Sequence, residues 1–120
     1  MVYLYIAAGG VAGALCRYLV GSWVAWNGTG IPWATLSINL AGSILLGFLL
    51  RSFPAWDTAP DVRALLTVGF CGSFTTFSTF AYETVVLAQG GAYGLAAAYA
   101  LGSLVLGVAG VLLGMALAAV

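Results

Sequence analysis

The sequence has little charge and lacks the side chains on which much enzyme chemistry depends. Of its 120 residues, 5% are charged and none is histidine, whereas a soluble globular chain has roughly 25% charged residues. The two cysteines do not form a CxxC pair, and the carboxylates form no clustered pair. Metal–thiolate sites and histidine-based acid–base catalysis are therefore excluded, and we expect no enzyme. With a net charge of zero, the chain also offers no basic surface to nucleic acid.

What the sequence has is hydrophobicity, with 63% hydrophobic residues and a mean hydropathy of +1.13. A helix needs about 20 apolar residues to cross a bilayer. The N-terminus lacks the basic region of a cleavable signal peptide. We predict an all-α membrane protein with a single four-helix transmembrane domain over residues 1–120, its helices at about 2–23, 32–50, 62–88 and 93–120.

The third predicted span contains an unusually polar stretch, Gly69–Phe80. Two glycines and five hydroxyl side chains fall within these twelve residues, together with several phenylalanines. Glycine weakens a helix, and serine and threonine offer the freed backbone other hydrogen-bond partners. Unpaired backbone groups are costly in hydrocarbon, so such breaks occur where they are buried in protein or line an aqueous cavity, and they mark ion sites. We predict that the third helix is broken in mid-membrane.

The polar side chains inside the spans suit an anion better than a cation. Glu83 is the one carboxylate deep within a helical segment, whereas Thr35 and Asn39 share one face of the second span. Amide and hydroxyl groups donate hydrogen bonds, and the ring edges of Phe77 and Phe80 carry the positive end of a quadrupole. Two alternatives remain open: Asn39 as a bond between helices, and the phenylalanines as ordinary packing.

The predicted break also provides a possible cation site. Carbonyls freed around Gly72 and Thr75 could hold a small cation such as Na⁺, although the glycines could also merely kink the helix. Arg17 in the first span is either an anchor that reaches the membrane interface or part of an anion entrance.

Orientation in the membrane is weakly specified. Arg51 and Arg63 flank the second loop, and the loops on the opposite side have no arginine, so the positive-inside rule has little to act on. A chain that inserts both ways could form an antiparallel pair. Four short helices cannot enclose a polar path and still pack, so we expect an oligomer.

Three stretches resemble the Fluc/CrcB family of fluoride channels, and the resemblance covers nearly the whole chain. They are Gly9–Tyr18, Pro32–Ser43 and Gly69–Phe80, of which the third is the most specific. Ser73 stands where we expect a second glycine after Gly72, a departure that would stiffen the break.

The resemblance implies a dual-topology antiparallel homodimer with two pores, in the cell (inner or plasma) membrane, for passive export of fluoride that enters as HF. It implies a central structural Na⁺ bound by the backbone carbonyls of Gly72 and Thr75. It places Arg17 at the vestibule. It implies that Asn39 contacts fluoride and holds a ring in place. The implied pore residues are Asn39, Phe77, Phe80, Thr35, Ser78, Thr79, Tyr99, Ser103 and Glu83. The implied partners are fluoride, a second copy of the chain and the lipid bilayer.

Three other functions are weighed against this one. A small proton-coupled multidrug exporter needs a membrane carboxylate early in the chain, but the first span has Arg17 and no acid. A fluoride/proton antiporter would use Glu83. A structural assembly subunit would not explain a helix break rich in hydroxyl groups.

Overall fold

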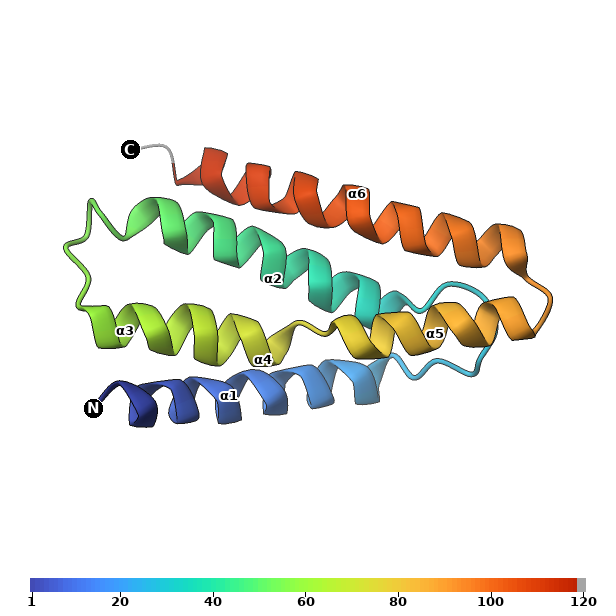
Figure 1. Cartoon of the computed structure of the whole chain (residues 1–120), viewed down its shortest axis with the longest axis horizontal. Coiled ribbons are helices and arrows are strands. Elements are labelled where there is room, and N and C mark those ends of the chain that lie inside the picture. The colour runs from blue at the N-terminus through green and yellow to red at the C-terminus, as the bar shows by residue number, and fades with distance from the viewer. Residues whose placement is uncertain (119–120) are drawn as a thin grey trace.

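The molecule measures 50 × 29 × 20 Å along its principal axes. Four helical spans run side by side along its longest dimension (Figure 1). The structure is a computed structural model and describes residues 1–118. Within these residues, four helices are long and apolar enough to cross a membrane, which confirms the predicted all-α class. The first, second and fourth spans are α1 (Val2–Trp23), α2 (Trp33–Ser52) and α6 (Tyr93–Leu117).

The third span, Pro60–Gln89, is made of four successive segments. It begins with the α-helical turn α3 and continues into a π-helical segment, η1, before the short helix α4. The longer helix α5 completes it. Their bounds are α3 Pro60–Ala64, η1 Leu65–Cys71, α4 Gly72–Phe74 and α5 Phe77–Gln89.

The helix ends differ from the predicted ones by a few residues, and proline explains two of the differences. Pro32 is the N-cap of α2 and not part of its first turn, so the helix begins at Trp33. Pro60 starts α3, because its missing N–H would have no intrahelical partner there. The last two residues of the predicted fourth span, 119–120, lie outside the described residues.

The spans pack as two pairs that are joined side by side (Figure 1). Helix α1 lies along α3, η1 and α4, and α2 lies along α6, while α5 also packs against α6. The start of α1, the end of α6 and the loop after α2 lie at one end of the bundle, and the other two connections lie at the opposite end.

Glycines make both pairs unusually close. A Cβ on Gly9 or Gly13 of α1 would collide with a carbonyl oxygen of η1. On the other side of the bundle, a Cβ on Gly47 of α2 would collide with the backbone of α6, and a Cβ on Gly114 of α6 would collide with the backbone of α2. The backbones therefore touch directly, as small residues allow between membrane helices.

Candidate functional site

The helical backbone of the third span is interrupted at Thr75 and Thr76. Both residues are extended, with φ −77° and ψ 158° at Thr75 and φ −148° and ψ 120° at Thr76. Gly72 lies before the interruption and is helical, with φ −64° and ψ −31°. The change of direction thus falls on two hydroxyl residues and not on the glycine that the sequence analysis placed in the break.

The interruption deprives several carbonyl groups of their helical donors, including those of Gly72 and Thr75. In a continuous α-helix the carbonyl of Gly72 would accept from the amide of Thr76, and that of Thr75 from the amide of Thr79. The Thr76 amide instead donates to Oδ1 of Asn39, at 2.8 Å. The Thr79 amide donates to the side-chain Oγ1 of Thr76, at 3.2 Å, which makes Thr76 the N-cap of α5.

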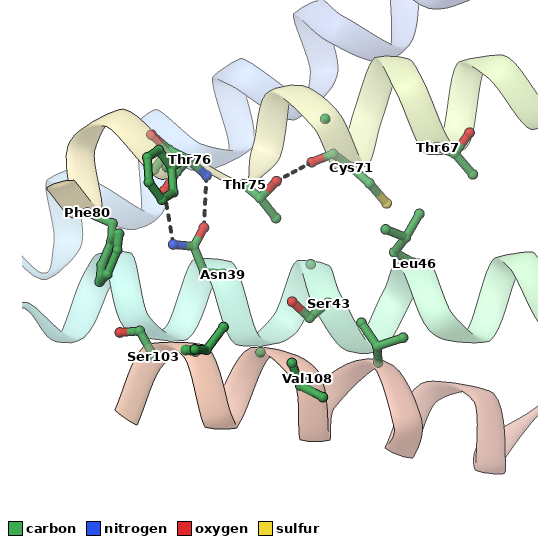
Figure 2. A pocket seen from close by; sticks show the side chains of 16 residues that line it. Asn39, Ser43, Leu46, Thr67, Cys71, Thr75, Thr76, Phe80, Ser103 and Val108 are labelled. Atoms are coloured by element: carbon green, nitrogen blue, oxygen red, sulfur yellow. Dashed lines mark hydrogen bonds between the residues drawn. The ribbon is translucent and has the colours of Figure 1, made fainter. Parts of the chain in front are cut away.

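Asn39 projects from α2 and binds the interruption at both atoms of its amide (Figure 2). Besides accepting from the Thr76 amide, it donates from Nδ2 to the Thr76 carbonyl oxygen, at 3.0 Å. An asparagine Nδ2 carries two N–H groups, so one donor remains for another partner. What Asn39 holds directly is the backbone of Thr76, which leads into Phe77.

Phe77 and Phe80 occupy the first turn of α5 in different surroundings. Phe77 is 79% exposed, whereas Phe80 is partly buried. Their ring centroids are 5.8 Å apart, and the Phe80 ring lies 5.3 Å from that of Tyr99 on α6. Phe80 therefore packs into the bundle, while Phe77 projects from the chain.

A groove of about 500 Å³ runs between α2, the third span and α6, past the interruption. Figure 2 shows Asn39, Thr75, Phe80 and Ser103 around it. The Oγ of Ser103 is buried and has no hydrogen-bond partner within residues 1–118. Since a buried hydroxyl without a partner is costly, this group is available to a ligand in the groove.

Three helices meet at a buried carboxylate, Glu83. Its Oε1 accepts from the Oγ1 of Thr35 on α2 at 2.7 Å, and its Oε2 accepts from the hydroxyl of Tyr99 on α6 at 2.6 Å. All three side chains are buried. Both carboxylate oxygens thus have a donor from a different helix, so Glu83 fixes α5 between α2 and α6.

A second cavity, of about 730 Å³, is lined by Arg17, Thr35, Thr76, Thr79 and Glu83 among others. Its wall includes residues of α1, α2 and α5. The Nε of Arg17 donates to the carbonyl oxygen of Ser73, at 3.0 Å, in a partly buried setting. Arg17 therefore has a fixed partner at the end of α4, which the sequence analysis did not anticipate.

The structure brings most of the predicted site residues together around the interruption. Asn39, Phe77, Phe80, Ser103, Gly72 and Thr75 line the groove, and Arg17, Thr35, Thr79 and Glu83 line the second cavity. Tyr99 reaches the same region through Glu83. Ser78 is exposed on α5 and is not part of either lining.

Thr76 was not among the predicted site residues, yet it lines both cavities and takes part in both Asn39 hydrogen bonds. A signal for it was present, because a threonine directly before a helical segment is a typical N-cap. The hydrogen bond from Arg17 to the carbonyl of Ser73 was not predicted either. That contact depends on how α1 packs, which no local pattern reports.

These features define an integral membrane protein whose polar groups are gathered around an interrupted helix, an arrangement typical of transport proteins. The family model described as CrcB-like protein, Camphor Resistance (CrcB), matches residues 4–115. The chain belongs to this family.

Curated relatives match most of the chain. A protein of Rhodospirillum centenum is 46% identical over 116 residues, which cover 95% of this chain and 92% of the relative. A protein of Thermus thermophilus and one of Chlorobaculum tepidum are each 48% identical, over 88% of this chain and 84% and 85% of theirs. All three are named fluoride-specific ion channel FluC. Ion channels are not enzymes, so the family agrees with the predicted absence of an enzyme activity.

Proposed function

We propose that this chain forms a fluoride-selective channel that exports cytoplasmic fluoride by passive permeation across the cell (inner or plasma) membrane. The observation that carries the proposal is the pair of unused donors at one groove. The buried Oγ of Ser103 has no partner within the described residues, and Asn39 keeps one N–H after its bond to Thr76. Among residues 1–118, no carboxylate lines this groove. Donors without competing negative charge favour a small anion.

The groove is open along one side, and a second copy of the chain is the proposed missing wall. Phe77 supports this arrangement, because a large ring that is 79% exposed beside the groove leaves the path unfinished in one protomer. A two-fold axis that closes one groove closes both, so a dimer has two pores. The weak charge bias of the loops allows the chain to insert in both orientations, as the proposed antiparallel dual-topology homodimer requires.

The freed carbonyls of Gly72 and Thr75 fit a structural Na⁺ at the centre of this dimer. Their helical donors are bound elsewhere, to Asn39 and to the Thr76 side chain. Oxygen atoms at the end of a half-helix are the ligands that interrupted membrane helices give to Na⁺. An opposed second copy would add its own two carbonyls. The bound ion would neutralise the converging carbonyl dipoles and hold the two interruptions together.

The pore lining is proposed to include Asn39, Phe77, Phe80, Thr79 and Ser103. Ser78 is exposed in one protomer, and it is proposed to join the lining only when the second copy closes the groove. Thr35, Glu83 and Tyr99 form a polar route beside it, supported by their shared hydrogen bonds. Arg17 lies at the second cavity, which would serve as a vestibule.

A fluoride/proton antiporter is the second candidate, because a carboxylate, Glu83, is buried at the second cavity. The two functions are separated in liposomes that contain only this polypeptide. They are loaded with potassium fluoride or potassium chloride, and efflux is started with valinomycin. A channel releases fluoride but not chloride, without stoichiometric proton uptake. An antiporter takes up protons in a fixed ratio to fluoride. Equal release of fluoride and chloride, or no release, would refute the proposed function.

A further inference from the structure

Gly9, Gly13 and Arg17 lie four residues apart, on one face of α1. The two glycines bring the backbone of α1 against the π-helical segment, since a Cβ on either would collide with the carbonyl oxygen of Leu65 or Phe70. One turn further along the same face, Arg17 reaches the next exposed carbonyl, that of Ser73. The close approach of α1 thus delivers the guanidinium to the end of α4.

The carbonyl of Ser73 needs this donor. In a continuous helix it would accept from the amide of Phe77, but Phe77 begins α5 after the extended pair. The last carbonyls of a helix have no intrahelical partner and carry the negative end of its dipole. Arg17 supplies a donor and a positive charge at this point, with Nε 3.0 Å from the oxygen.

The interruption is therefore held from two sides. Arg17 on α1 binds the carbonyl just before it, and Asn39 on α2 binds the amide and carbonyl of Thr76 within it. The carbonyls of Gly72 and Thr75 lie next to these bonds along the chain. Their directions depend on where the end of α4 and the start of α5 are fixed.

We propose that Arg17 is a positioning residue, which sets the end of α4 through the Nε bond to Ser73 and so orients the carbonyls of Gly72 and Thr75. This inference rests on the proposed function, because it assigns those carbonyls to Na⁺. It differs from a role for Arg17 as an electrostatic attractor of anions. The bond matters in the first case and the charge matters in the second.

Glutamine separates the bond from the charge. Its Nε2 is attached to the same side-chain carbon as the Nε of arginine, so Arg17→Gln keeps a donor at the bonding position and removes the charge. Arg17→Met gives a side chain similar in length to that of glutamine, but with neither a donor nor a charge. Arg51→Gln is the matched control, because it removes one charge from the exposed end of α2, away from both cavities.

Three quantities are measured for each variant: the maximal fluoride efflux rate, the fluoride concentration at half of that rate, and the Na⁺ concentration that gives half of the maximal rise in melting temperature. If Arg17 positions α4, Arg17→Gln stays within about threefold of wild type in all three, because the hydrogen bond is kept. Arg17→Met loses the bond and requires about tenfold more Na⁺, a factor within the range expected for the loss of one ordinary hydrogen bond. Arg51→Gln behaves as wild type.

An electrostatic role predicts a different result: Arg17→Gln and Arg17→Met would both need more fluoride to reach half of the maximal rate, by the same factor, while their Na⁺ requirement would stay unchanged. That result would overturn the proposal. If Arg17→Met does not fold, the Na⁺ requirement of Arg17→Gln decides alone, since an increase of about tenfold contradicts positioning by a retained donor. The proposed function is judged separately, on the wild type. Wild-type protein without fluoride-selective efflux fails that test whatever the variants do.

Discussion

Asn39 and Thr76 are joined by two hydrogen bonds that run in opposite directions. The Nδ2 of Asn39 donates to the Thr76 carbonyl at 3.0 Å, and the Thr76 amide donates to the Oδ1 of Asn39 at 2.8 Å. A side-chain amide can satisfy a donor and an acceptor of the same residue in this way because it carries both kinds of group. The pair ties α2 to the interruption of the third span.

Asn39→Asp should impair fluoride efflux by about tenfold or more, because a carboxylate can still accept from the Thr76 amide but cannot donate to its carbonyl. Its negative charge would also repel an anion in the groove. Efflux from liposomes measures the effect. Asn27→Asp is the matched control, since Asn27 lies in an exposed loop and its Oδ1 accepts bonds from Thr29, which a carboxylate would also accept. An undiminished rate for Asn39→Asp would contradict a direct role in permeation.

Phe77→Ile and Phe80→Ile should each slow fluoride efflux while the protein remains a dimer. Isoleucine keeps apolar bulk but removes the positive ring edge that can face an anion. The efflux rate and the elution volume on size-exclusion chromatography are compared with those of Phe48→Ile. Phe48 packs against Trp56 and lines neither cavity. Wild-type rates in both groove variants would remove these rings from the pore.

Replacing Na⁺ by a large organic cation such as N-methylglucamine should lower the melting temperature of the purified protein. A ligand that binds only the folded state at about 100 times its dissociation constant stabilises that state by about 2.7 kcal/mol. K⁺ at equal ionic strength is the control for salt effects. If the melting temperature is the same in all three cations, the carbonyls of Gly72 and Thr75 do not hold a stabilising Na⁺.

The four spans were predictable because hydropathy and helix length are local properties of the sequence. The exact position of the interruption was harder to predict. Gly72 has the lower helix propensity, yet it is helical, while Thr75 and Thr76 are extended. Asn39, a residue 37 positions away, hydrogen-bonds the Thr76 backbone and so stabilises the interruption at this place. A partner on another helix is not visible in the local pattern.

The same limit applies to the buried carboxylate. Thr35, Glu83 and Tyr99 were all predicted as pore residues from the family resemblance. It could not show that the two hydroxyl groups bind opposite oxygens of one carboxylate, because that depends on how α2, α5 and α6 pack.

Tyr99→Phe should destabilise the protein by about 1–3 kcal/mol, because the buried Oε2 of Glu83 would lose its donor. The midpoint of chemical or thermal unfolding measures this loss. Tyr93→Phe, at the exposed start of α6, removes the same hydroxyl where no buried group depends on it. Equal stability of the two variants would show that Glu83 does not require the Tyr99 bond.

Gly42→Ala should lower fluoride efflux and weaken Na⁺ stabilisation together, because its Cβ would collide with the Cγ2 methyl group of Thr75. Small-to-large changes in a packed interior cost about 1–3 kcal/mol. Gly102→Ala on α6 is the control, since a Cβ there meets nothing within 4 Å. Adding Thr75→Ser to Gly42→Ala removes the colliding methyl group and keeps a hydroxyl that can donate to the Cys71 carbonyl.

The double variant should therefore recover efflux and the response to Na⁺ beyond the sum of its single effects, as expected for residues in direct contact. Strictly additive effects would mean that Gly42 does not act through Thr75. Recovery would show that the space left by one glycine on α2 sets the position of the interruption, since Thr75 Cγ2 is the nearest atom that a Cβ at residue 42 would meet.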